Sequence, residues 1–316
     1  MRVLVVTSLW PGPNTYAGRQ VQSLCESLSA QDSCRVDVHL LRGRGDSKFV
    51  TGMWGVRSAV RRDRPDVILA VYGPSVIACG LVRSVPRVVY LLGSDVNRAR
   101  VRRVVSRVAG RATLPVFVSE TLRRRWPDPD VGVVVPNGVD RQIFRPASKA
   151  SARARLGLPP TGPRVMFGGV RSVTTKNYPR FEAVLRLVQE SSPATAPLEL
   201  TGRQSPGQVA AVIQSADVVL LTSDQGTEGS PTIVKESVAC GVPVVTVDVG
   251  DVGRWVSAES GAVIPWADED TLVGHLADAV ISRMSPSVDH PAYTPREFDS
   301  DAVAERFADV LRSRIR

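Results

Sequence analysis

Short apolar runs alternate with longer amphipathic segments along most of this chain. The first run, Arg2–Thr7, is apolar at nearly every position, which is typical of a strand buried on both faces of a parallel sheet. The segment Ala17–Ala30 instead repeats its apolar residues at helical spacing, at Val21, Leu24, Cys25 and Leu28. The alternation recurs, and it predicts an α/β fold with doubly wound sheets.

Further strands and helices follow the same pattern. Strands are expected at Arg35–Leu41, Asp66–Tyr72, Arg87–Leu92, Val116–Ser119, Gly132–Val135, Arg164–Phe167, Leu198–Thr201, Asp217–Thr222 and Pro243–Val247. Helices are expected at Tyr178–Glu190 and Gly207–Ala216, and the last 16 residues are amphipathic.

One crossover carries most of the chemistry. Between the strands Asp217–Thr222 and Pro243–Val247, we expect a helix that Ser230 caps and that begins with Pro231, because these residue types favour those positions. Gly241 follows the last turn, and Pro243 prevents continuation. The preceding loop then lies at the carboxyl end of a strand, where open α/β sheets bind ligands.

The start of this helix is suited to an anion. The amides of Thr232 and Ile233 point outward with the positive end of the helix dipole. Glu228 precedes the helix and Glu236 lies one turn beyond Thr232, so two carboxylates border the same place. Together they suit a sugar joined to a nucleoside diphosphate. Either glutamate alone is better explained as a solvated charge at the end of a helix.

The stretch "EGSPTIVKESVACGVPVVTVDVGDV" resembles the two-glutamate motif of retaining glycosyltransferases of family 4, within glycosyltransferase group 1. The resemblance implies the GT-B fold, with two Rossmann-like doubly wound domains facing across a cleft. It also implies that Glu228 lies by the donor sugar and that Glu236 holds the ribose hydroxyls. Ser230 stands where the family often has a bulkier residue.

Two cations also match the family. Arg171 and Lys176 stand five apart in the loop after the strand at 164–167, as do the Arg and Lys that bind the donor diphosphate in the family. The resemblance implies catalytic roles for Glu228, Arg171 and Lys176. The expected donor-binding residues are Gly18, Arg171, Lys176, Glu228, Gly229, Ser230, Pro231, Thr232, Ile233 and Glu236.

The first half carries weaker matches. Gly18 matches a family glycine that faces the donor, although packing explains a single glycine equally well. The segment "LLGSDVN" resembles a family segment in which Leu92 is often His. Asp95 could orient an acceptor hydroxyl, and the alternative is that it caps the next helix.

Length and a connecting segment indicate the domain organisation. A chain of 316 residues suggests two domains, and "PNGVDRQIFRP" resembles the family's interdomain connection. We expect an acceptor-side domain at 1–145 and a donor-side domain at 146–296, with a helix at 297–316 that crosses back to the first domain.

Charge is concentrated in the first half. Residues 1–145 hold 23 Lys and Arg against 11 Asp and Glu, whereas the remainder holds 17 against 20. This favours an anionic or lipid-linked acceptor or peripheral contact with a membrane, with an arginine-rich composition as the alternative. The stripe Val101, Val104, Val105 and Val108 is expected to pack on the sheet, with membrane contact second. No nucleic-acid partner is expected.

Several function classes are excluded or disfavoured. The first loop lacks G-x-G-x-x-G, which disfavours a nicotinamide enzyme. Four cysteines without C-x-x-C spacing and three scattered histidines indicate no metal cluster and a reduced setting. Capping and solvation explain the Asp-x-Asp pairs at 128/130, 268/270 and 299/301. We therefore expect no metal and no cofactor. Because no signal peptide is visible, we expect a cytoplasmic location, and a peripheral position at the inner membrane face if there is membrane contact.

The sequence thus predicts a retaining, metal-independent glycosyltransferase that uses a UDP or GDP sugar and an unidentified acceptor. Two alternatives are a non-catalytic sugar-nucleotide binding protein or partner subunit, and a GT-B sugar-nucleotide epimerase.

Overall fold

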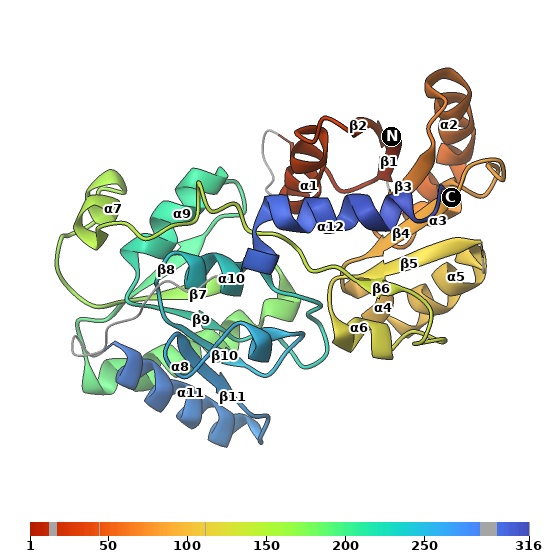
Figure 1. Cartoon of the computed structure of the whole chain (residues 1–316). Helices are drawn as coiled ribbons and strands as arrows, with labels where there is room; N and C mark the ends of the chain where they lie inside the picture. The colour runs from red at the N-terminus through yellow and green to blue at the C-terminus, as the bar shows by residue number, and fades with distance from the viewer. Residues whose placement is uncertain (13–17, 44, 111, 285–295, 316) are drawn as a thin grey trace. The chain divides into compact units, whose positions relative to one another are not determined.

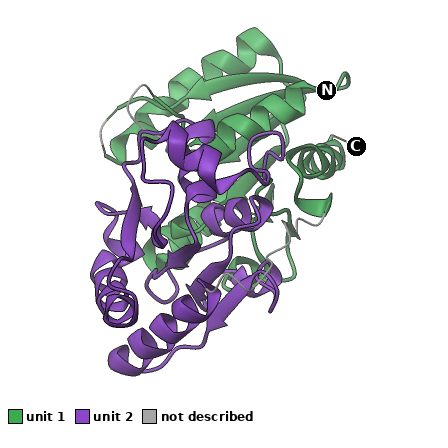
Figure 2. Ribbon diagram, turned by 90° about the vertical axis from the view of Figure 1, so that its left-hand side faces the viewer, with its two compact units in different colours: residues 1–12, 17–138, 296–316 green, residues 13–16, 139–295 purple. Residues whose placement is uncertain are grey.

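A computed structural model describes residues 1–12, 18–43, 45–110, 112–284 and 296–315 of the chain. The chain divides into two compact units, coloured separately in Figure 2: one comprises residues 1–12, 17–138 and 296–316, and the other mainly residues 139–295. Each unit is built on its own parallel sheet. Among the described helices, none has both the length and the apolar composition needed to span a bilayer.

The sheet of the first unit has six parallel strands in the order β2-β1-β3-β4-β5-β6 (Figure 1). They are β1 (Arg2–Thr7), β2 (Arg35–Leu40), β3 (Val67–Val71), β4 (Arg87–Leu91), β5 (Thr113–Phe117) and β6 (Val133–Val134). The chain adds β2 on one side of β1 and then β3 on the other. This reversal defines a doubly wound sheet.

Helices cover both faces of this sheet. They are α1 (Arg19–Ser29), α2 (Ser47–Asp63), α3 (Ser75–Ala78), α4 (Ser94–Asn97), α5 (Ala99–Ala109), α6 (Glu120–Arg124) and α12 (Ser300–Arg312). The last helix lies alongside α1 (Figure 1), while α3 contacts both α2 and α5. Right-handed crossovers therefore place α1 and α12 on one face and α2, α3 and α5 on the other.

The core of the first unit forms where the central strands meet these helices. Every residue of β3 is fully buried, as expected for a strand covered on both faces. From α12, Val303, Phe307 and Leu311 join this core. The ring of Phe307 packs edge-on against Tyr90 of β4, with 4.8 Å between the ring centroids.

The valine stripe of α5 is only partly buried. Val105 is buried, but Val104 is 50% exposed and Val108 is 37% exposed, so the expectation that the whole stripe packs on the sheet is wrong. The buried line runs through Val105 and Ala109, four residues apart. Val104 and Val108 each lie one residue earlier and are rotated about 100° away from it.

The second unit has five parallel strands in the order β11-β10-β9-β7-β8. The strands are β7 (Arg164–Val170), β8 (Ala196–Leu200), β9 (Val218–Leu221), β10 (Val244–Val247) and β11 (Gly261–Ile264). The helices are α7 (Lys149–Arg155), α8 (Tyr178–Ser191), α9 (Pro206–Ser215), α10 (Thr232–Ala239) and α11 (Glu269–Arg283). The strand order reverses between β7 and β9, and sheets of this kind bind ligands beyond the carboxyl ends of the strands at such a point.

Candidate functional site

Two loops of the second unit leave the sheet side by side where the strand order reverses. One follows β7 and ends at Asn177, and the other follows β9. The hydroxyl of Thr222 donates to the carbonyls of Lys176 and Asn177, at 3.0 and 3.1 Å. The amide of Asp224 donates to the carbonyl of Thr175 at 2.9 Å. These bonds join two loops that are far apart in the sequence.

Asn177 anchors the first loop to α8. It adopts a left-handed conformation, with φ of 51°, which asparagine tolerates better than most residues. Its side-chain oxygen accepts from the amide of Arg180 and so caps α8, while its side-chain nitrogen donates to Asp224 at 2.8 Å. Asn177, the residue after Lys176, is therefore bonded both to α8 and to the loop that follows β9.

Lys176 and Glu228 meet between these loops. The Lys176 ammonium lies 2.6 Å from Glu228 Oε1, and the Ser223 hydroxyl donates to the same oxygen at 2.6 Å. Burial raises the pKa of Glu228, but Lys176 and Ser223 outweigh it and hold the pKa below its ordinary value. Glu228 is therefore ionised at neutral pH, beside a cation.

A glycine makes room for this lysine. A Cβ atom added at Gly169, in β7, would lie 2.8 Å from Cγ of Lys176. A larger residue at position 169 would thus displace the lysine side chain that reaches Glu228. The sequence analysis did not identify Gly169, and the Gly168-Gly169 pair inside a strand was the available signal.

The helix α10 begins one residue later than expected. Pro231, not Ser230, is the N-cap residue, and α10 starts at Thr232 without a side-chain cap. The prediction that Ser230 caps this helix is wrong because its hydroxyl donates to Asp251 instead, at 2.9 Å. Gly229, Ser230 and Pro231 are buried in the turn. The first amides of α10, including those of Thr232 and Ile233, have no partner within a helix.

The side chain of Glu236 is buried. It is 7% exposed, and burial raises its pKa to about 7, although the neighbouring Lys235 opposes this rise. A carboxyl group with this pKa is partly protonated at neutral pH. Its predicted contact with ribose stays a prediction.

The Arg171 side chain packs against α8. Its guanidinium stacks over the ring of Tyr178, 4.2 Å from the centroid, and lies 3.5 Å from Glu182. Both contacts are on α8, and the Arg171 side chain is 62% exposed. The structure thus pairs Lys176 with Glu228, whereas the Arg171 side chain contacts Tyr178 and Glu182.

In the first unit, Gly18 is required by the local backbone. It has a φ of 89°, and a Cβ there would lie 2.6 Å from the backbone of Leu9 and Trp10. Only glycine fits both demands, so the packing explanation is sufficient at the start of α1. The predicted approach of a donor to Gly18 stays a prediction, and residues 13–17 of this loop lie outside the described residues.

Asp95 supports a turn. It is fully buried and accepts hydrogen bonds from the amides of Gly73, Leu92 and Gly93. Burial raises its pKa, and these amides oppose the rise. Its expected role as a helix cap is wrong, because Gly93 is the N-cap of α4. Its predicted role toward an acceptor hydroxyl stays a prediction.

In the part of the chain that the structure describes, the acidic pairs at 128/130, 268/270 and 299/301 do not join other acidic, His or Cys side chains in a metal site. Asp268 caps α11 by accepting from the amide of Thr271, as expected. Within the described ranges, no three His, Cys, Asp or Glu side chains are grouped so that they could hold a metal ion. The four cysteines are buried and not disulfide-bonded.

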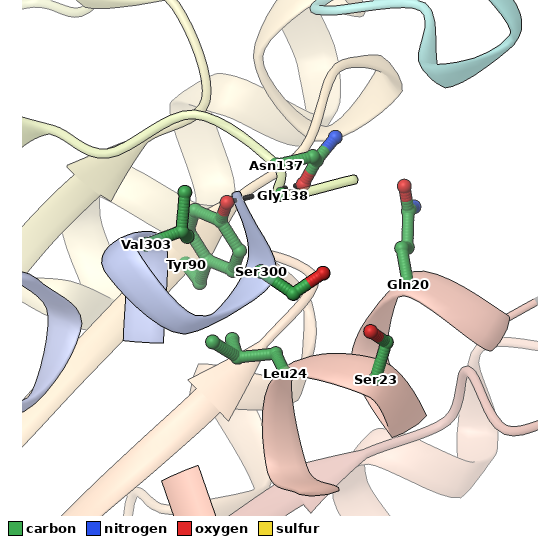
Figure 3. A pocket seen from close by; sticks show the side chains of 8 residues that line it. All are labelled: Gln20, Ser23, Leu24, Tyr90, Asn137, Gly138, Ser300 and Val303. Atoms are coloured by element: carbon green, nitrogen blue, oxygen red, sulfur yellow. Dashed lines mark hydrogen bonds between the residues drawn. The ribbon is translucent and has the colours of Figure 1, made fainter. Parts of the chain in front are cut away.

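A small pocket lies in the first unit (Figure 3). It is lined by Gln20, Ser23, Leu24, Tyr90, Asn137, Gly138, Ser300 and Val303, and its volume is about 20 Å³. That volume is room for about one water molecule. The Tyr90 hydroxyl bonds to Val135 and Asn137 beside it. This pocket is too small for a sugar nucleotide.

Sequence analysis also missed a buried polar cluster under the start of α10. Lys235 is 1% exposed, and its ammonium donates to Ser230 at 2.9 Å. The Ser230 hydroxyl in turn donates to Asp251, which is 8% exposed. The charged Lys235 among apolar residues of α10 was the signal that could have identified it.

Comparison with solved structures establishes the fold. The sucrose-phosphate synthase of Thermosynechococcus elongatus superposes with a TM-score of 0.76 at 17% identity, covering 99% of this chain and 98% of that chain. HepE of Anabaena, solved in complex with UDP-glucose, gives a TM-score of 0.70 at 14% identity, covering 99% and 100%. The two units therefore have the GT-B fold, as expected.

Sequence comparison gives a family match for part of the second unit. Residues 184–290 match the model of glycosyl transferases group 1, and these residues include Glu228, α10 and β10. The resemblance to group 1 glycosyltransferases is thus confirmed. A D-inositol 3-phosphate glycosyltransferase of Segniliparus rotundus is 33% identical over 172 residues, which cover 45% of this chain and 38% of that protein. The next two such relatives are matched over 40% and 51% of their lengths.

Proposed function

We propose that this protein is a retaining, metal-independent glycosyltransferase of family 4 that transfers a sugar from a UDP or GDP donor to an acceptor hydroxyl. The observation that carries the proposal is the Lys176–Glu228 pair, which lies where the strand order reverses, in the loops that lead to α8 and α10. A solved neighbour of this fold holds UDP-glucose, which supports a nucleotide sugar as the donor.

In this proposal the diphosphate lies at the first amides of α10. The helix dipole and the Lys176 ammonium stabilise the charge that develops on the leaving group, which is the role a metal ion has in other transferases. Arg171 joins them once it leaves Tyr178. Glu236 holds the ribose, and Glu228 lies beside the sugar.

The reaction itself uses no enzyme nucleophile. The bond between the anomeric carbon and the diphosphate oxygen breaks, and the acceptor oxygen bonds to the same face of that carbon. The acceptor hydroxyl passes its proton to the departing phosphate. In this proposal Glu228, whose pKa is held below its ordinary value, stabilises the positive charge that develops on the sugar.

We assign the acceptor side to residues 1–145, the donor side to 146–296, and a helix that returns to the first domain to 297–316. The charges of the first unit support an anionic or lipid-linked acceptor. On one face of its sheet, α2 and α5 carry eight Lys and Arg against one Asp, whereas α1 and α12 on the other carry three against four. The basic face also exposes Trp54 and Val50, at 71% and 58%.

An exposed tryptophan among cations is suited to the surface of an anionic membrane. We therefore propose peripheral contact of this face with the cytoplasmic side of a membrane. A relative named for a phosphorylated acceptor, D-inositol 3-phosphate, is consistent with an anionic acceptor as well.

The test is incubation with a panel of UDP and GDP sugars, with and without EDTA. We expect slow release of free sugar that keeps the anomeric configuration of the donor. The rate of release should be the same with and without EDTA. A strict requirement for Mg²⁺ or Mn²⁺ would contradict the metal-independent mechanism. Inversion at C2 of the donor would instead identify an epimerase, and binding without turnover a sugar-nucleotide binding protein.

A further inference from the structure

Lys235 is a charged side chain in an otherwise closed part of the second unit. It is 1% exposed, its ammonium lies 2.9 Å from the Ser230 hydroxyl, and it lies 4.6 Å from the centroid of the Trp255 ring. The Ser230 hydroxyl accepts from Lys235 and donates to Asp251 at 2.9 Å. A single hydroxyl thus links a cation of α10 with a carboxylate that follows β10.

These contacts join two turns of the backbone. Ser230 lies in the turn directly before α10, and Asp251 lies in the turn after β10. The two turns also touch through their backbones: a Cβ added at Gly250, which has a φ of 61°, would lie 2.8 Å from the carbonyl oxygen of Gly229. The close approach requires glycine at 250 and is reinforced by the side-chain link.

The turn before α10 is not held by a capping side chain. Pro231 is the N-cap residue and supplies no capping hydrogen bond, because its side chain has no polar atom. Ser230, which could have capped the helix, is bonded to Lys235 and Asp251 instead. The position of the first α10 amides therefore depends on this buried link.

Burying a cation is unfavourable unless it is paired, and apolar residues of similar size often stabilise a core at least as well. A buried lysine is therefore poorly explained by stability alone. It is better explained by the position that it imposes on the groups around it.

We propose that Lys235 is a positioning residue that fixes the turn Gly229–Pro231, and with it the amides of Thr232 and Ile233, through Ser230 and Asp251. The link to nucleotide binding rests on the proposed function, in which these amides hold the donor diphosphate. The role in fixing the turn does not depend on it.

The charge of Lys235 makes this role sensitive to pH. Burial lowers its pKa to about 8, Arg254 adds to the lowering, and Asp251 and Glu236 oppose it. Loss of the proton removes the attraction to Asp251 and loosens the turn. Nucleotide affinity is therefore expected to fall as the pH rises through about 8 in the unmodified protein, and this fall should be absent in Lys235→Met.

Hydrogen–deuterium exchange of residues 228–234, in the full chain without ligand, tests the turn directly. We expect Lys235→Met and Ser230→Ala to speed exchange there about tenfold, and Ser230→Thr, which keeps the hydroxyl, to retain slow exchange. Using Ser230→Ala as well keeps the test valid if Lys235→Met does not fold. Unchanged exchange in the variants that fold would overturn the proposal.

Arg153→Met is the matched control. Arg153 is also buried, at 4% exposure, and pairs with Asp217 in the same unit, but it supports α7 and α9 rather than the turn. It should leave exchange at 228–234 and UDP or GDP affinity within about twofold, whereas Lys235→Met should weaken that affinity about tenfold. Equal effects of the two substitutions would reduce Lys235 to a purely structural role. If the unmodified protein binds neither nucleotide, the proposed function fails, and the exchange result still decides whether Lys235 fixes the turn.

Discussion

The ammonium of Lys176 and the carboxylate of Glu228 form an ion pair at 2.6 Å, and both side chains are mostly buried, at 21% and 14% exposure. With Lys176 in place, Glu228 stays ionised despite its burial. In the proposed function, a bound diphosphate would compete with Glu228 for the same ammonium.

Replacement of Lys176 by Ala is expected to weaken UDP or GDP binding by about 1.5 to 3 kcal/mol, the range for a hydrogen bond to a charged group. Titration calorimetry measures this directly. Lys149→Ala is the control, because Lys149 also pairs with an aspartate of the second unit, Asp217, but lies on α7. Unchanged affinity in Lys176→Ala would mean that Lys176 only pairs with Glu228.

Replacement of Glu228 by Gln should separate turnover from nucleotide binding. UDP and GDP carry no sugar, so their affinity should change little, or increase slightly because Lys176 loses its anionic partner. Turnover should fall at least about 100-fold, which corresponds to about 2.7 kcal/mol of lost transition-state stabilisation. Steady-state kinetics and calorimetry on one preparation provide both numbers. Normal turnover in this variant would remove Glu228 from the chemistry.

The sequence predicted α10 and its two flanking strands well because their boundary signals are local. Gly241 and Pro243 end the helix by backbone geometry alone. The start was misplaced by one residue because Ser230 bonds to Asp251, and the pattern of neighbouring residues does not encode a contact between two separate turns. The Lys176–Glu228 ion pair escaped prediction for the same reason, since it depends on the strand order and on Gly169.

The spacing of residues in the sequence also did not predict which side chains are exposed. The spacing of the valines in α5 correctly predicted a helix, but it did not distinguish the buried Val105 from the half-exposed Val104. Which side of a stripe is covered depends on the neighbouring helices. Arg171 shows the same limit, because its spacing from Lys176 matches the family while its side chain stacks on Tyr178.

Binding to anionic vesicles tests the basic face of the first unit. The chain should sediment with phosphatidylglycerol vesicles and not with phosphatidylcholine alone, and salt should weaken the binding. Trp54→Ala should reduce it about tenfold, because a half-buried indole contributes on the order of 1.4 kcal/mol. Ile281→Ala is the control, as Ile281 is an exposed apolar residue of α11 in the second unit. Equal binding to neutral vesicles would argue against a role for the cations of this face, and binding to neither kind would argue against membrane contact.

Glu236 is expected to oppose stability while it supports binding. Burial raises its pKa to about 7, above the ordinary 4.5, so the folded chain holds this proton more tightly than the unfolded chain. The contribution of Glu236 to stability therefore falls as the pH rises from about 4.5 to 7, and its full cost is present above pH 7. A residue that cannot ionise avoids this cost.

Glu236→Gln should consequently be more stable than the unmodified protein at pH 8, by on the order of 2 to 3 kcal/mol, and about equally stable near pH 4.5. The thermal midpoint at pH 8 should rise by about 5 °C. Nucleotide affinity should fall by about 1 to 3 kcal/mol if the carboxylate accepts the ribose hydroxyls. Thermal unfolding at both pH values, combined with calorimetry, measures the two effects. A variant that loses stability at pH 8 would show that the charged Glu236 stabilises the fold, and one that gains stability without losing affinity would remove Glu236 from the ribose site.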